Sequence, residues 1–106
     1  MNTQRTSAFL MANLGSEVTR LISARERNNQ AQIGACYKRS LTILKEIFSM
    51  PDMHTRVAEI NILSDLIHDL ANANPMLHVS RKNIVSYFTP FSIRVVNSQN
   101  RGALVR

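Results

Sequence analysis

The apolar positions of the chain recur with the three- and four-residue spacing of amphipathic helices in four separate segments. In the first, residues 7–27, one face carries Leu10, Leu14, Val18, Leu21 and Ile22 when successive residues are placed 100° apart. Thr6 or Ser7 is suited to cap this helix. Gly15 falls beside the apolar face, at a cost of about 1 kcal/mol of helix propensity relative to alanine. A close approach by a neighbouring helix would explain this glycine, and so would chance placement.

The second and third segments follow the same pattern and are joined by a very short turn. Residues 31–49 form a stripe of Ile33, Tyr37, Leu41, Leu44 and Phe48, which Cys36, Ile43 and Ile47 widen. Residues 51–72 begin with Pro51 and Asp52, which suit the first turn of a helix, and their apolar arc approaches half of the circumference. The short turn predicts that these two helices form an antiparallel hairpin.

The fourth segment, residues 80–97, admits two interpretations. As a strand, it would place on one face an alternating set of residues: Val85, Tyr87, Thr89, Phe91, Ile93 and Val95. As a helix, it has Ile84, Phe88, Phe91 and Val95 on one stripe with Tyr87 at the edge. The helix is favoured because Ser80 is a good N-cap and because no other segment offers a strand for pairing. Pro90 then predicts that this helix is kinked or broken near its middle.

The sequence therefore predicts an all-α protein, a bundle of four helices over residues 7–27, 31–49, 51–72 and 80–97. Glycine and proline total only six residues, which fits long helices better than an all-β fold. At 106 residues the chain is expected to form a single domain, residues 1–97. The polar and basic stretch 98–106 is expected to be a frayed tail.

Cysteine content and hydropathy bear on the compartment. The single cysteine, Cys36, excludes an internal disulfide and fits a reducing environment. No apolar run approaches the ~20 residues that a membrane-spanning helix needs, and the N-terminus lacks a signal-peptide pattern. We therefore expect a cytoplasmic protein with no membrane partner.

The net charge of +6 is unevenly distributed. Residues 51–75 carry one base and four acids, whereas residues 76–106 carry five bases and no acid. Arg81 and Lys82 follow the Ser80 cap, a pattern suited to phosphate contact at a helix N-terminus. Nucleic-acid binding through this helix start is thus an alternative function. Against it, the positions that would face bases are valine, tyrosine and phenylalanine, and the basic residues elsewhere are compatible with an ordinary solvated surface.

Candidate chemistry is sparse. Asp65, His68 and Asp69 share one side of the third helix and resemble half of a di-metal carboxylate site, but no second Glu-x-x-His motif supplies the other half. Cys36 lies beside an apolar stripe, where a buried thiol is the ordinary outcome. The sequence contains no glycine-rich phosphate loop and no nucleophile elbow. We therefore expect no enzymatic activity, no metal site and no cofactor.

The fourth helix carries more apolar surface than one contact can bury. Val85, Ile93 and Val96 point away from its main stripe. Such a helix is buried on several sides or lies at an interface. We expect Tyr87, Phe91 and Ile93 to contact a partner, most economically a second copy of the chain and otherwise another helical protein. In the competing interpretation, the tail folds back through Leu104 and Val105 and covers this surface. The predicted function is a small helical protein–protein interaction or scaffold module that self-associates into a homodimer.

Overall fold

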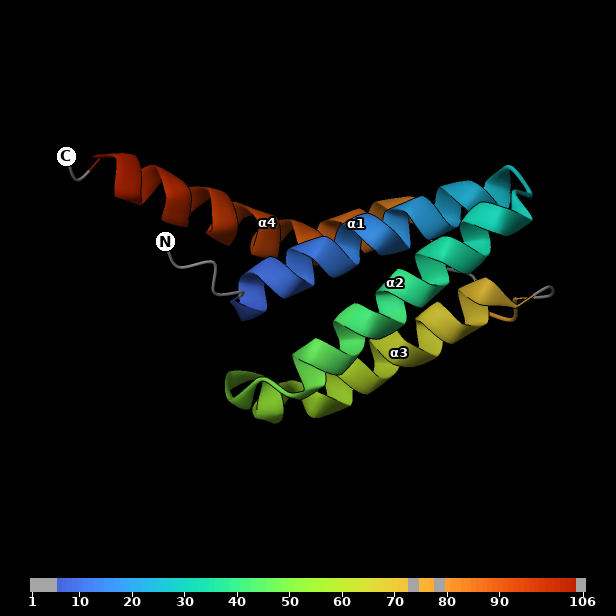
Figure 1. The fold of residues 1–106 in the computed structure, drawn as a ribbon, viewed down its shortest axis with the longest axis horizontal. Coiled ribbons are helices and arrows are strands. Elements are labelled where there is room, and N and C mark those ends of the chain that lie inside the picture. Colours follow the sequence, from blue (N-terminus) through green and yellow to red (C-terminus); the bar gives the residue numbers. More distant parts are fainter. Residues whose placement is uncertain (1–5, 73–74, 78–79, 105–106) are drawn as a thin grey trace.

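Four α-helices and one short 3₁₀ helix make up the structure, a computed structural model that describes residues 6–72, 75–77 and 80–104 (Figure 1). The helices are α1 (Ser7–Glu26), α2 (Gln30–Phe48), η1 (Pro51–Arg56), α3 (Val57–Ala71) and α4 (Arg81–Leu104). No strand occurs among the described residues. The all-α, four-helix prediction is confirmed.

Helix α1 lies at the centre of the arrangement. It packs along α2 on one side and along α4 on the other, while α3 packs mainly on α2 (Figure 1). The pairs α1–α4 and α2–α3 thus form two layers (Figure 1). The molecule measures 51 × 27 × 25 Å, and its long dimension includes the end of α4, which projects beyond the start of α1 (Figure 1).

Short polar side chains begin three of the helices. The Thr6 side chain accepts a hydrogen bond from the Phe9 amide, the Asn29 side chain accepts one from the Gln32 amide, and the Ser80 hydroxyl accepts one from the Asn83 amide, each at 3.1 Å. These bonds satisfy amides of the first turn that have no partner inside the helix. Thr6 and Ser80 were both predicted as caps.

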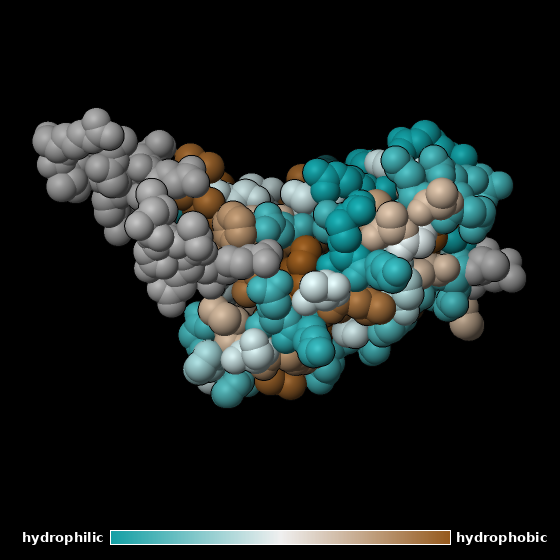
Figure 2. Space-filling view, in the orientation of Figure 1, coloured by the Kyte–Doolittle hydropathy of each residue, from teal (hydrophilic) through white to brown (hydrophobic). Residues whose placement is uncertain are grey.

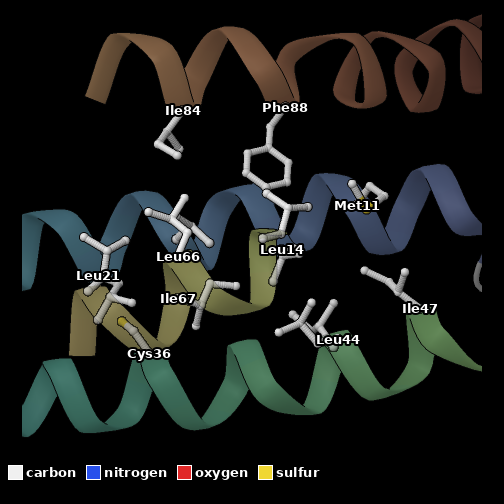
Figure 3. Close-up of a cluster of buried hydrophobic side chains, with 14 of the residues drawn as sticks. Met11, Leu14, Leu21, Cys36, Leu44, Ile47, Leu66, Ile67, Ile84 and Phe88 are labelled. Carbon is white, nitrogen blue, oxygen red and sulfur yellow. The ribbon is translucent and has the colours of Figure 1, made fainter. Parts of the chain in front are cut away.

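The hydrophobic core lies where the two layers meet. Figure 3 shows Met11, Leu14 and Leu21 of α1 between side chains of α2, α3 and α4. All three α1 side chains are fully buried, as are Ile47 of α2 and Ile67 of α3. Their burial removes apolar surface from water. Each Å² removed stabilises the fold by about 25 cal/mol, which makes burial the main favourable contribution to folding.

The buried face of α2 differs from the predicted stripe. Phe48 is 37% exposed and Tyr37 and Leu41 are only partly buried, whereas the core side holds Ile33, Cys36, Ser40, Ile43, Leu44 and Ile47. Steps of four residues drift by about 40° each around a helix, so a stripe built mostly on such steps leaves the core. Alternating steps of three and four stay on one side. Ser40 interrupts that pattern in the sequence, but its hydroxyl donates to the Cys36 carbonyl oxygen at 2.8 Å and is buried without cost to its hydrogen bonding.

Two helix boundaries also differ from the prediction. The segment 51–72 begins as the 3₁₀ helix η1 and becomes α-helical only at Val57. Helix α4 continues without a break through Pro90, so the predicted alternative of two separate pieces is wrong. The backbone is helical through residues 98–104; the frayed tail expected for residues 98–106 stays a prediction, and residues 105–106 lie outside the described part of the chain.

Candidate functional site

The aromatic residue of α4 that packs directly on α1 is Phe88. Phe88 is 4% exposed and points with Ile84 toward α1 (Figure 3). It lies directly on Gly15, where an added Cβ would come within 2.6 Å of the Phe88 Cγ atom. The close approach suggested for Gly15 is therefore real, because only a glycine leaves room for the phenylalanine ring.

Tyr87 and Phe91 attach α4 to the start of α3. The Tyr87 hydroxyl donates a hydrogen bond to Glu59, and the Glu59 carboxylate also accepts two from the Arg56 guanidinium, at 2.6 and 3.1 Å. The guanidinium carbon of Arg56 lies 5.0 Å from the centre of the Phe91 ring, within the range of a cation–π contact. These four side chains form one cluster between η1, α3 and α4, which we call the Arg56–Glu59 cluster.

The ionisation of the cluster follows from these contacts. Hydrogen bonding from Arg56 lowers the pKa of the Glu59 carboxyl, and the bond from Tyr87 acts in the same direction against partial burial. Burial raises the pKa of the Tyr87 phenol, and its hydrogen bond to the Glu59 carboxylate raises it further. At neutral pH the cluster thus holds a charged Arg56–Glu59 pair and a neutral tyrosine.

The structure separates the three residues that were expected to contact a partner. Phe91 is 4% exposed and belongs to the core, and Tyr87 is half-buried in the Arg56–Glu59 cluster. Of the three, Ile93 alone is exposed, at 52%. The sequence pattern places all three correctly around the helix, but it does not reveal that η1 and the start of α3 approach α4 from the Tyr87 side.

A second apolar surface of α4 remains outside the core. Val85 is 46% exposed and Val96 is 51% exposed. With Ile93 they fall within an arc of about 80° around the helix, away from the buried stripe of Ile84, Phe88 and Phe91. Figure 2 shows hydrophobic surface on α4 just before the grey C-terminal stretch. We call Val85, Ile93 and Val96 the outer face of α4; the prediction that they point away from the core is confirmed.

A shallow groove of about 340 Å³ runs beside this outer face, between α4 and α1. The α1 side of the groove is lined by small side chains, Ala12, Gly15, Ser16 and Thr19, together with Arg20. The α4 side is lined by Val85, Phe88, Thr89 and Ser92. Small residues on both walls allow another backbone to come close to the surface.

The basic helix start of the alternative hypothesis is partly engaged. Arg81 donates hydrogen bonds to the Glu26 carboxylate at 2.6 Å and to the Ser23 hydroxyl at 3.0 Å, which joins the start of α4 to the end of α1. Lys82 is exposed. Of the two predicted phosphate contacts, one is therefore already held by an acidic side chain of the protein.

The hydrophobic pattern of α1 gives no sign of a buried carboxylate that the fold contains. Glu17 of α1 is 8% exposed, and it accepts hydrogen bonds from Arg20 and from Arg39 of α2, both at 3.0 Å. The two arginine side chains are more than half exposed, so the buried carboxylate is paired with cations that solvent still reaches. The spacing of Glu17 and Arg20, three residues apart on one helix, is the signal that could have indicated half of this arrangement. Its partner on α2 becomes visible only in the fold.

The residues weighed for metal or thiol chemistry have structural contacts. His68 Nδ1 lies 2.6 Å from the Tyr37 hydroxyl, and the Asp69 carboxylate accepts hydrogen bonds from the amides of Met76 and Leu77. Cys36 is a buried free thiol. Within the described part of the chain, no three His, Cys, Asp or Glu side chains come together in a way that would hold a metal ion.

Two further findings bear on the kind of protein this is. Among the described residues, none of the helices is both long enough and apolar enough to cross a lipid bilayer. Comparison with protein-family models, with curated proteins and with solved structures finds no match to this chain.

Proposed function

We propose that this protein is a small helical interaction module that self-associates, as a cytoplasmic homodimer, through the outer face of α4. The observation that carries the proposal is the exposure of Val85, Ile93 and Val96, about half of each side chain, on one side of one helix. Isolated apolar residues on a surface are ordinary. Three on one helix face, beside a groove lined by small residues, are typical of a contact surface.

The competing interpretation, in which the tail covers this face, loses support from the course of the chain. A helical backbone leads straight on, and α4 is helical as far as Leu104. It therefore carries the chain away from Val85 as far as Leu104 instead of back over it (Figure 1), and Val105, the other residue of that interpretation, lies outside the described residues. The outer face is left to a partner, and a second copy is the simplest one because closed two-fold dimers are the commonest assemblies.

Sedimentation equilibrium tests the proposal directly. The wild-type protein is expected to show about twice the chain mass of 12.0 kDa. Replacing the outer face, with Val85→Ser, Ile93→Ser and Val96→Ser together, should return the mass to that of one chain. Circular dichroism should show that the helices are retained, because none of the three side chains is part of the core.

The matched control is Ile62→Ser on α3. Ile62 is 68% exposed, more than any residue of the outer face, but it lies on another helix. Its replacement should leave the dimer intact. A wild-type protein that stays monomeric at high concentration would contradict the proposal, and so would a dimer that survives the triple substitution.

Nucleic-acid binding through Ser80, Arg81 and Lys82 stays a prediction, and the contact between Arg81 and Glu26 counts against it. Titration with DNA and RNA at low salt tests it. Phosphate contacts would make the affinity fall steeply as salt is added, and Lys82→Gln would reduce that slope. No binding at low salt would reject this alternative.

A further inference from the structure

Four of the exposed residues of α4 have a spacing that reads the same in both directions. Val85, Thr89, Ser92 and Val96 are all exposed, and they follow one another at intervals of four, three and four residues. At 100° per residue they fall within about 60° of one another, so they form a single line along the helix. We call this line the α4 stripe; Ile93 flanks it.

A line with this symmetry can pair with a copy of itself in the antiparallel direction without leaving any of its four residues unmatched. If two α4 helices lie antiparallel with a two-fold axis between Thr89 and Ser92, Val85 faces Val96 of the partner subunit and Thr89 faces Ser92 of the partner subunit. The branched apolar side chains then meet at both ends, and the small hydroxyl side chains meet in the middle, where the helices must come closest. In a parallel pair, each residue would instead meet its own copy.

The charges favour a contact between two copies at this part of α4. Each chain carries a net charge of +6, so two copies repel each other over most of their surfaces. Residues 83–93 contain no charged side chain, and the axis passes through this uncharged stretch. Two copies therefore meet there with the least like-charge repulsion. The four side chains of the α4 stripe themselves carry no positive group with which an acidic partner could pair.

The projecting end of α4 gives the pairing a second contact. A stable dimer buries about 1,200–2,000 Å² in total, more than four half-exposed side chains per copy provide. At 1.5 Å per residue, residues 98–104 lie about 11–20 Å from the proposed axis, and Arg81 lies about 14 Å from it on the other side. The end of one α4 therefore runs alongside the start of the partner's α4. Just before that start, Met76 and Leu77 are 84% and 49% exposed.

We infer that the dimer is built by antiparallel pairing of two α4 helices about an axis between Thr89 and Ser92. This inference rests on the proposed function, and it adds the partner's orientation and register. It makes the α4 stripe, together with the helical extension beyond Asn97, the dimer contact.

Cysteine pairing in solution distinguishes the orientations. In a Cys36→Ala background, Val85→Cys and Val96→Cys are made as separate chains that carry tags of different length. Antiparallel pairing brings position 85 of one chain opposite position 96 of the other, within the 4.4–6.8 Å between Cα atoms that a disulfide requires. Two copies of the same variant are about 16 Å out of register. Under mild oxidation, a disulfide-linked dimer is therefore expected in the mixture and not with either variant alone.

Each outcome decides the matter. Linked dimers of each variant with itself would indicate a parallel pair and overturn the inference. The absence of linkage in the mixture, while sedimentation still reports a dimer, would overturn the register and leave the proposed function standing. A wild-type protein that sediments as a monomer would overturn both. A mixture of the Val85→Cys chain with an Ile62→Cys chain is the matched control and should give no linked dimer.

Discussion

Gly15 and Gly34 both lie inside helices, but their surroundings are opposite. At Gly15 an added methyl group would collide with the base of the Phe88 side chain, whereas at Gly34 it would meet no atom within 4 Å. The base of a ring cannot move aside without moving the helix that carries it. One substitution, glycine to alanine, should therefore have opposite effects on stability at the two positions.

We expect Gly34→Ala to raise the free energy of unfolding by about 1 kcal/mol, the difference in helix propensity. Gly15→Ala should lower it, because overpacking typically costs about 1–3 kcal/mol and exceeds the same propensity gain. Urea denaturation measures both changes.

A double-mutant cycle isolates the cause at Gly15. Phe88→Ala alone should cost about 3–5 kcal/mol, since the ring is buried. In that background the collision is gone, so Gly15→Ala should become neutral or stabilising. If alanine at position 15 destabilises the protein equally with and without the ring, the contact between α1 and α4 is not the one described.

The Arg56–Glu59 cluster predicts that the free energy of unfolding depends on pH in the acidic range. The folded state lowers the pKa of Glu59 below its ordinary value of 4.5. The folded protein therefore binds fewer protons at this site than the unfolded chain does, and the contribution to stability is present above that pH. As the pH falls through the lowered pKa, the carboxylate becomes protonated and the contribution disappears.

Comparing wild type with Glu59→Gln by urea denaturation at several pH values measures this contribution. The stability difference should be largest at neutral pH and should shrink below about pH 4.5. Asp65→Asn, at an exposed position of the same helix, is the control and should not reproduce the effect. A difference that stays constant with pH would mean that the ionised form of Glu59 does not stabilise α4.

At the scale of the element, α4 is unusual because a proline lies in its interior. Pro90 has no amide hydrogen to donate to the carbonyl of Ser86, and its ring crowds that carbonyl. The Thr89 hydroxyl donates to the Val85 carbonyl oxygen at 2.6 Å, so the turn before the proline gains a side-chain bond. Pro90 is exposed, so its removal should sacrifice little packing.

Pro90→Ala is therefore expected to stabilise the folded chain by up to about 3 kcal/mol. Thermal unfolding at low protein concentration, where dissociation does not contribute, measures the gain. Ser86→Ala, one turn earlier and also exposed, should gain less than about 1 kcal/mol. A loss of stability on removing the proline would mean that the shape it imposes is needed to seat α4 on α1.

Elements also show how far the sequence could predict the structure. The buried stripe and the outer face of α4 follow from periodicity alone, because a 100° rotation per residue fixes which side chains share a side. The contacts of Tyr87 do not follow from periodicity. The pattern of one helix carries no information on the direction from which other helices approach it. Buried Glu17 was missed for a related reason, because it is tolerated in the interior only with the Arg39 guanidinium of another helix beside it. Ser40 differs, since its acceptor is the Cys36 carbonyl four residues earlier in the same helix, which helical geometry alone supplies.

At the scale of the whole molecule, charge and apolar surface oppose each other in self-association. Two chains of net charge +6 repel each other, whereas the outer faces of their α4 helices attract each other by burial. Added salt screens the charge repulsion and leaves the attraction by burial in place. The Debye length falls from about 30 Å at 0.01 M to about 10 Å at 0.1 M ionic strength, so the repulsion between two copies is screened over this range.

The proposed dimer should therefore tighten as sodium chloride is raised from 0.01 to 0.1 M, when sedimentation is followed at a fixed protein concentration near the dissociation constant. Nucleic-acid binding through phosphate contacts would instead weaken with salt. Each such contact releases counterions, and added salt opposes their release. The triple outer-face variant carries the same charge and should stay monomeric throughout. If self-association weakens with salt instead, attraction between opposite charges holds the two copies together. That attraction would then join the acidic segment 51–75 of one chain to the basic segment 76–106 of the other, and the apolar outer face would not be the contact.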